Sequence, residues 1–245
     1  VGGGTLVLGH VRALGSPLGS TTVMSGATLD LTGLTLGTEP IILDGGTLRN
    51  SAAAAATFAG SLTASAPSFV SATSELTLSG ALGGTAPITV ASGIVRVTGN
   101  SAAASVPVVV AAGATLAGSG ILGGPLSVAG TLAPSAGSSG VATLSAPVAS
   151  LQPTAVTAFR LQKNNNGTAA DRLAVSGTLT LGGAFSVTLA GQPLAAGDTF
   201  TVFSAASFAG GFSSITLPYL SGDLIWDRSD LSLIHISEPT RPRLI

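Results

Sequence analysis

A short phrase recurs along the chain and constrains its fold more than any other feature: a glycine, with or without one small residue, followed by Thr-Leu. Several copies continue as alternating polar and apolar residues, which is typical of a half-buried β-strand. The phrase therefore predicts a series of short strands, each opened by a glycine turn. The copies are Gly4-Thr-Leu6, Gly26-Ala-Thr-Leu29, Gly46-Thr-Leu48, Gly113-Ala-Thr-Leu116, Gly130-Thr-Leu132 and Gly177-Thr-Leu179.

The spacing of these strands, roughly 16 to 28 residues, falls in the range of proteins built from stacked repeats. One such repeat cannot bury its apolar face alone, whereas stacking the next one at about 4.8 Å covers it. The spacing predicts an all-β chain in the form of a β-solenoid. A β-sandwich, which also contains many short strands, stays open as an alternative.

Aromatic residues divide the chain. Six of the eight phenylalanines, together with Tyr219 and Trp226, lie after residue 158, and they predict a C-terminal region with a broader core. We expect β-solenoid repeats in residues 1–150, a C-terminal β region or cap in residues 151–230, and a separate tail in residues 231–245. The six phenylalanines are Phe159, Phe185, Phe200, Phe203, Phe208 and Phe212.

Charge and hydropathy exclude two classes of partner. Only 8% of the residues are charged and the net charge is -1, so the chain lacks the basic excess that nucleic-acid binding needs. Mean hydropathy is high at +0.62, but Gly, Pro and Ser interrupt every apolar run before it reaches the ~20 residues of a spanning helix. We expect no nucleic-acid partner and no membrane insertion by this chain.

Several longer phrases carry a family resemblance. Ser25-Gly-Ala-Thr-Leu-Asp-Leu31, Leu43-Asp-Gly-Gly-Thr-Leu-Arg-Asn-Ser51, Leu116-Ala-Gly-Ser-Gly-Ile-Leu-Gly-Gly-Pro-Leu126 and Trp226-Asp-Arg-Ser-Asp-Leu231 look like autotransporter-associated β-strand repeat proteins. These are large bacterial surface or secreted proteins, often ending in an autotransporter barrel or a PEP-CTERM-type sorting tail. The resemblance implies a right-handed parallel β-helix, as in a passenger domain, and an extracellular or cell-surface location.

The last fifteen residues, LSLIHISEPTRPRLI, differ from the rest of the chain in composition. Permitted codons for Leu231 to Arg241 spell a sequence that resembles a transposase adapter of shotgun sequencing libraries, so the tail resembles translated adapter read-through. Two prolines and several charges predict that residues 231–245 are disordered. Since the chain also starts at Val1 rather than Met, we expect it to be a fragment of a longer protein, with His10 as its only histidine outside the tail.

The acidic residues before the tail are spread thinly, whereas polysaccharide lyases and hydrolases need clustered groups for acid/base work. The stretch Gly118-Ser-Gly120-Ile-Leu-Gly123 matches a dinucleotide-binding pattern, but the following Gly124-Pro125 predicts a turn and a strand instead of the required helix. The chain has no Cys for a zinc site. We expect no catalytic, cofactor-binding or metal-binding residues. The acids are Asp30, Glu39, Asp44, Glu75, Asp171, Asp198, Asp223, Asp227 and Asp230.

One strongly polar loop, Lys163-Asn-Asn-Asn-Gly-Thr168, predicts an Asn-Gly turn between strands at Phe159-Arg-Leu161 and Arg172-Leu-Ala-Val175. Its oxygens leave a Ca²⁺ or glycan contact open as an alternative. Tyr219 and Trp226 have the chemistry to stack on a sugar, but in an aromatic-rich region we expect them in the core.

These features predict a non-enzymatic structural or display segment of a bacterial cell-surface or secreted protein, with adhesion as an elaboration. An unidentified surface or glycan ligand is the only partner we expect. The alternative is a carbohydrate-binding or polysaccharide-degrading β-helix.

Overall fold

The computed structural model covers all 245 residues and describes the chain except for residues 222–223, 228–232 and 238–245. The described part consists of β-strands and connecting turns and contains no helix. No described segment therefore forms a helix able to cross a membrane. The chain is all-β, as the sequence predicts.

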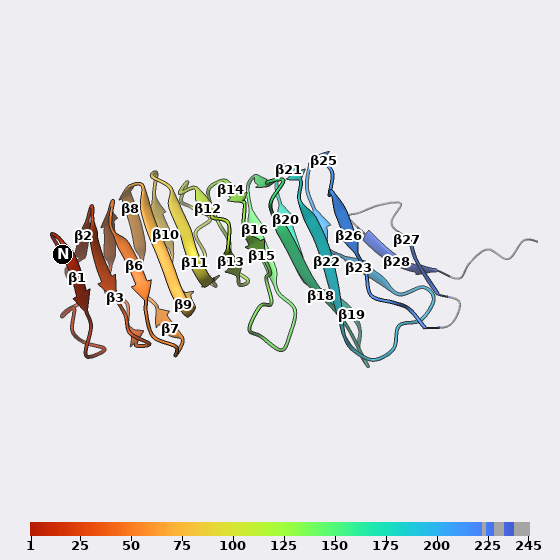
Figure 1. Cartoon of the computed structure of the whole chain (residues 1–245), viewed down its shortest axis with the longest axis horizontal. Helices are drawn as coiled ribbons and strands as arrows, with labels where there is room; N and C mark the ends of the chain where they lie inside the picture. Colours follow the sequence, from red (N-terminus) through yellow and green to blue (C-terminus); the bar gives the residue numbers. More distant parts are fainter. Residues whose placement is uncertain (222–223, 228–232, 238–245) are drawn as a thin grey trace, which may run out of the picture.

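Most strands belong to one sheet of 18 strands, whose neighbours lie side by side along the long axis of the molecule (Figure 1). These strands are β1 (Gly4–Val7), β3 (Ala27–Asp30), β4 (Thr35–Leu36), β6 (Thr47–Asn50), β7 (Ala56–Phe58), β9 (Ser68–Leu78), β11 (Ile88–Val97), β12 (Val108–Val110), β13 (Ala114–Ala117), β14 (Leu126–Val128), β15 (Thr131–Leu132), β17 (Ala149–Leu151), β18 (Val156–Asn164), β19 (Gly167–Ala170), β21 (Thr178–Leu181), β22 (Ala184–Gly191), β25 (Ser207–Gly210) and β26 (Ser214–Thr216).

Three smaller sheets complete the described part. The first two are parallel, and the third is antiparallel. They comprise β2 (Thr21–Met24), β5 (Ile41–Asp44), β8 (Leu62–Ala66) and β10 (Leu82–Gly84); then β16 (Thr143–Ala146), β20 (Arg172–Val175) and β24 (Phe203–Ser204); and finally β23 (Thr199–Thr201), β27 (Ile225–Asp227) and β28 (Leu233–Ser237).

The recurring Thr-Leu phrases stack on one another in register. Thr5 pairs with Thr28, which pairs with Thr47, and the leucine after each threonine pairs in the same way. Three of the six copies open with a glycine in the left-handed region, which disfavours side chains: Gly4, Gly26 and Gly113 have φ values of 65°, 76° and 82°. The repeat in the sequence is thus the repeat in the sheet.

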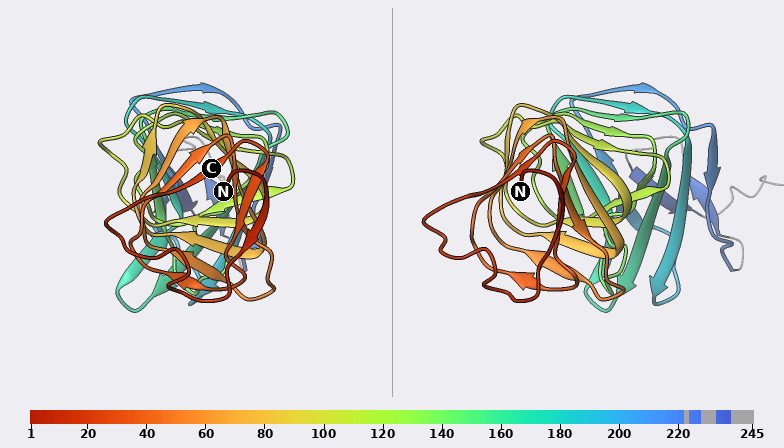
Figure 2. Two further views of the ribbon diagram at one scale, coloured as in Figure 1. Left: turned by 90° about the vertical axis from the view of Figure 1, so that its left-hand side faces the viewer. Right: turned by 60° about the vertical axis from the view of Figure 1, so that its left-hand side comes forward.

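We call each pass of the chain that pairs in parallel with the previous pass a layer. Seen from the N-terminal end, successive layers lie behind one another around a common interior (Figure 2). Layers early in the chain are short, with Ile88 pairing with Val108, whereas late layers are long, with Ser150 pairing with Thr180. The change falls between β15 and β16, where residues 133–142 form a loop that we call the junction loop.

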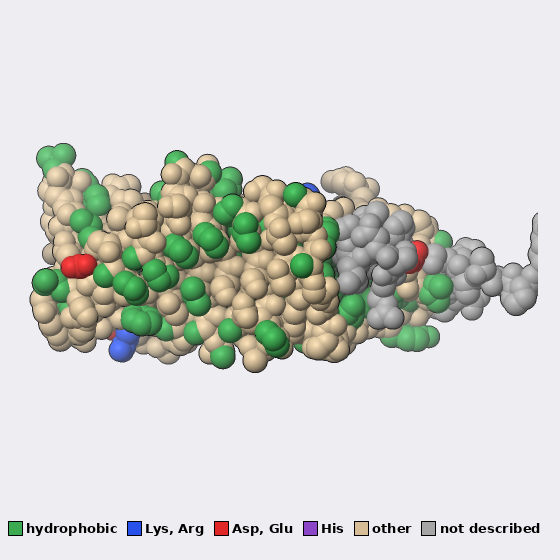
Figure 3. Space-filling model, turned by 90° about the horizontal axis from the view of Figure 1, so that it is seen from above, with side chains coloured by type: hydrophobic (Ala, Val, Ile, Leu, Met, Phe, Trp, Pro, Cys, Tyr) green, Lys and Arg blue, Asp and Glu red, His purple; other side chains and the backbone are tan. Residues whose placement is uncertain are grey.

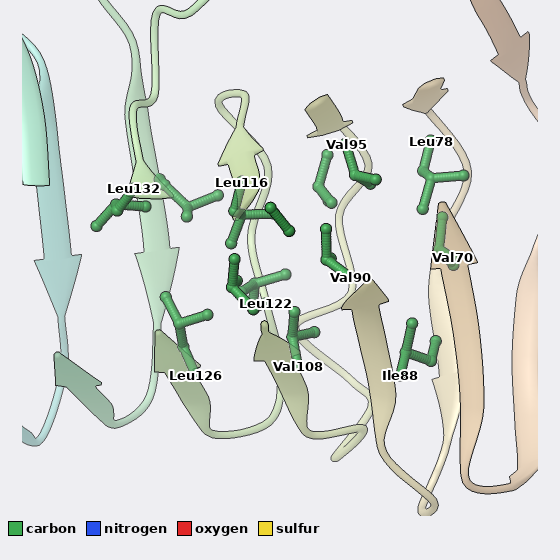
Figure 4. Close-up of a cluster of buried hydrophobic side chains, with 14 of the residues drawn as sticks. Val70, Leu78, Ile88, Val90, Val95, Val108, Leu116, Leu122, Leu126 and Leu132 are labelled. Atoms are coloured by element: carbon green, nitrogen blue, oxygen red, sulfur yellow. The ribbon is translucent and has the colours of Figure 1, made fainter. Parts of the chain in front are cut away.

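One continuous hydrophobic core fills this interior. It extends from Leu8 to Phe203, and side chains at matching positions of neighbouring layers follow one another in it, as Ile88, Val108 and Leu126 do in Figure 4. The predicted boundary at residue 150 falls inside β17, which pairs in parallel with strands on both sides of it. The aromatic region therefore extends the same core.

The structure differs from the predicted disordered tail at Leu233–Ser237, which form β28 between β23 and β27. The alternating Leu-Ile-His-Ile-Ser pattern suits a strand, and Ile236 is only 2% exposed. The rest of the predicted tail lies outside the described residues.

A turn lies in the predicted loop, since β18 and β19 form a hairpin in which Asn164 pairs with Gly167, but its two central residues are Asn165 and Asn166 instead of an Asn-Gly pair. Its second strand, however, is Gly167–Ala170. The predicted partner, Arg172–Val175, lies in another sheet as β20 and pairs in parallel with β16 and β24.

Candidate functional site: a polar clamp at the junction loop

The most connected group of polar side chains in the described part of the chain surrounds the junction loop. Four side chains form this group: Glu75 on β9, Arg96 on β11, Arg160 on β18 and Asp171 between β19 and β20. Each of them is hydrogen-bonded to the junction loop or to another member of the group. We call these four side chains the polar clamp. They come from strands on both sides of the change in layer length.

Asp171 fixes both ends of the junction loop. Its carboxylate is 1% exposed and accepts hydrogen bonds from the Ser135 hydroxyl at 2.6 Å and the Ala142 backbone N–H at 2.8 Å. A third bond comes from the backbone N–H of Arg160 at 2.9 Å. A buried carboxylate is costly unless hydrogen bonds satisfy it, and these three donors do so.

Glu75 and Arg96 form a bidentate pair on neighbouring strands. Arg96 Nε lies 2.7 Å from Glu75 Oε1, and Arg96 Nη2 lies 3.1 Å from Oε2. The same Nη2 donates to the backbone oxygen of Ala136 in the junction loop. Hydrogen bonding from Arg96 lowers the pKa of Glu75 below its ordinary value of 4.5, although burial opposes that shift. The pair therefore stays ionised at neutral pH.

Arg160 completes the clamp from the C-terminal side. Its Nη1 donates to the backbone oxygens of Ser138 at 2.6 Å and Gly140 at 3.0 Å. Arginine suits this role because its fixed fork of donors can satisfy several carbonyl oxygens of a turn at once.

The clamp's chemistry favours a structural role. A general acid or base must reach the proton that it transfers, and both carboxylates here are already engaged by protein donors. The described residues also contain no group of three His, Cys, Asp or Glu side chains that could hold a metal ion.

The other acidic residues named in the sequence analysis do not belong to the polar clamp. Asp30 is 2% exposed, accepts the N–H groups of Thr32 and Ser51, and lies 3.4 Å from Arg49 Nε. Glu39 accepts the Thr21 hydroxyl, and Asp44 accepts the Ser65 hydroxyl. Asp227 lies on β27, and the sequence positions Asp223 and Asp230 lie outside the described residues.

Asp198 forms an ion pair on the C-terminal side, with its Oδ2 2.7 Å from Lys163 Nζ. Burial opposes ionisation of Asp198, but the hydrogen bonds from Lys163 and from the backbone N–H of Ala195 outweigh it and lower the pKa. The pair joins the turn end of the β18–β19 hairpin to the segment before β23.

Two other sequence features have local explanations. The glycine pattern at Gly118, Gly120 and Gly123 runs from β13 through turns to β14, so the predicted turn and strand are confirmed. His10 accepts the backbone N–H of Arg12 through Nδ1, a contact within its own turn.

Sequence reasoning missed Asn50, the most completely satisfied polar side chain of the N-terminal layers. It is 0% exposed; its Oδ1 accepts the N–H groups of Gly33 and Ala52, and its Nδ2 donates to the oxygens of Ala54 and Glu75. Its partners span three layers. The only local signal is an Asn that ends a strand before a run of small residues.

No family model matches the chain, and neither does any curated protein. The resemblance to autotransporter-associated β-strand repeat proteins thus rests on the quoted phrases.

Proposed function

We propose that the chain is a right-handed parallel β-helix whose function is structural: a stiff spacer and display surface of a bacterial cell-surface or secreted protein, with adhesion as an elaboration. The observation that carries this proposal is the parallel register, which continues from β1 to β26 around one core. Resemblance to the β-strand repeat family supports the handedness and the location.

Stiffness would follow from how the layers share their bonds. An inner strand such as β12 pairs in parallel with β11 on one side and β14 on the other, so its backbone groups are satisfied by neighbours. Bending such a stack would break hydrogen bonds and open the core. Few charged side chains interrupt the face in Figure 3, where scattered hydrophobic side chains lie among uncharged ones and the backbone.

The polysaccharide-degrading alternative has less support. It requires acids gathered on one face, whereas the described acids lie apart and the two clamp carboxylates are occupied.

Removing one complete layer tests the proposal. Deleting residues 108–125 joins Pro107 to Leu126, as Pro125 joins it now, and removes no charged residue. A solenoid closes over the gap because Leu126 can take the place of Val108 in the register. We expect the variant to keep its β-type far-UV circular dichroism and cooperative thermal unfolding.

The matched control deletes only residues 108–116, about half of that layer. The remaining half should leave apolar side chains facing solvent and abolish cooperative unfolding. Equal damage from both deletions would contradict the proposed β-helix.

A further inference from the structure

Tyr219 is the most exposed aromatic side chain in the described part of the chain, at 90%. It is nevertheless held in place, because Leu220 beside it is buried and the indole Nε1 of Trp226 donates to the backbone oxygen of Pro218 at 2.7 Å. Trp226 thus packs against the core, as the sequence predicts, whereas Tyr219 does not. Core packing does not explain why a backbone segment that is held in place exposes the Tyr219 ring to solvent.

The ring stands beside a hollow of about 360 Å³, which is within the size range of small-molecule sites. One wall is the end of β22 and the residues after it, from Leu189 to Leu194; the other contains Tyr219, Leu220, Ser221 and Leu224. Gly191 keeps the first wall close to β18, since a Cβ there would lie 2.0 Å from the Lys163 oxygen.

One amide side chain, that of Gln192, lines the same hollow, and it is hydrogen-bonded to a second amide, that of Asn165. Gln192 lines it and donates from Nε2 to Asn165 Oδ1 at 2.6 Å, while its backbone N–H bonds to the Lys163 oxygen at 2.9 Å. Within the described residues, Gln192 Oε1 and Asn165 Nδ2 have no protein partner. One acceptor and one donor group are therefore held together and remain available to a ligand.

None of the described residues of the lining carries a charge, and the adjacent Lys163 is paired with Asp198. A flat aromatic ring beside paired amides suits a ligand with an apolar face and a polar edge, which is the form of a pyranose ring: its C–H groups can lie on the phenol ring while its hydroxyl groups meet the amides. A charged ligand would find no counter-ion among the lining residues that the structure describes.

We infer that the hollow beside Tyr219 binds a neutral saccharide, with Tyr219 as the stacking platform and Gln192 and Asn165 as the hydrogen-bonding groups. This inference goes beyond the proposed function, which assigns neither a binding site nor a class of ligand. It also does not depend on the handedness of the layers.

Native affinity electrophoresis of the full chain tests it, in gels containing hydroxyethylcellulose, xylan, galactomannan or laminarin, with polygalacturonate as the anionic comparison. We expect retardation by at least one neutral polysaccharide. Tyr219→Ala should weaken it about tenfold or more, and Tyr219→Phe should retain it because the ring remains. Gln192→Ala should weaken it by about threefold to tenfold.

Phe69→Ala is the matched control, because Phe69 is 44% exposed but lies far away on β9. It should leave retardation unchanged. Absence of retardation in every neutral gel, retardation by polygalacturonate alone, or binding that Tyr219→Ala leaves intact would each overturn the inference. Circular dichroism of each variant separates a lost site from a lost fold.

Discussion

The early and late layers of this molecule are built on the same plan at two sizes. In the early part, Thr28 pairs with Thr47 and Leu62 with Leu82, so that a layer takes about 20 residues. In the late part, Ala184 pairs with Ser214, and a layer takes about 30. The chain therefore changes its repeat length without leaving the parallel register.

The side chains change with the length. Early layers are filled mainly by Leu, Val and Ile, as Figure 4 shows, whereas late layers are filled by a group of phenylalanines. Phe185 contacts Phe159 at 5.7 Å, Phe203 at 5.3 Å and Phe212 at 5.2 Å between ring centroids. A longer layer encloses a wider interior, and larger side chains are needed to fill it at normal packing density.

The largest effect should come from emptying the wide interior. Phe185→Ala removes a 0% exposed ring from the middle of the phenylalanine group and should lower the free energy of unfolding by about 4 kcal/mol. Chemical denaturation followed by circular dichroism measures this change.

In the early layers, the comparison predicts that enlarging a buried side chain destabilises the fold. Leu116 is also 0% exposed, and Leu116→Phe should destabilise by about 2 kcal/mol because it forces a larger side chain among closely packed aliphatic neighbours; Phe58 is the one phenylalanine that the described early layers bury completely. If Leu116→Phe were neutral, layer length would not set the interior width, and the comparison would fail.

An effect between these two in size should appear where the short and the long layers meet. Asp171→Ala leaves the Ser135 hydroxyl and the N–H groups of Ala142 and Arg160 without their acceptor, which should cost about 3 kcal/mol. Limited proteolysis should then cut the junction loop first. Asp44→Ala, at an exposed bond to Ser65, is the control and should change stability by less than about 0.5 kcal/mol.

The smallest effect concerns the Glu75–Arg96 pair, whose side chains are 21% and 13% exposed. Arg96→Ala should cost about 1 kcal/mol at neutral pH, because it removes the donors of a partly buried carboxylate. Since the folded state lowers the pKa of Glu75, the pair contributes its stability above the ordinary value of 4.5 and loses it as the pH falls through the folded-state pKa.

Unfolding titrations from about pH 6 to pH 3 should therefore show the difference between wild type and Arg96→Ala shrinking with acid. A constant difference would mean that Arg96 acts by packing alone. Arg49→Ala is the control for removal of an arginine from an ion pair. The Arg49 side chain is 48% exposed and its Nε lies 3.4 Å from Asp30, so this pair is more exposed and longer than the Glu75–Arg96 pair.

The strands and their stacking could be predicted because the signals are local. The Gly-Thr-Leu phrases indicate short strands, and repetition of the phrase indicates which strands pair with one another. Leu233–Ser237 carried the same alternation, but the surrounding prolines and charges obscured it.

The clamp and the hollow could not be predicted, because their residues meet only in the fold. Ser135 and Asp171 are 36 positions apart, and Arg160 reaches back 22 positions to Ser138. The sequence near Tyr219 does not distinguish its exposed ring from the phenylalanines that fill the core. Whether Tyr219 or its neighbour Leu220 faces the core is decided only in the fold, where Leu220 is buried and Tyr219 is exposed.

The unequal layers also determine how the molecule would yield to a pulling force. A layer held mainly by its two neighbours can detach from an end of the stack without disturbing the rest. At about 3.4 Å per extended residue, an early layer would release about 70 Å of chain and a late one about 100 Å. The extension record of a single stretched molecule would then reveal from which end it came apart.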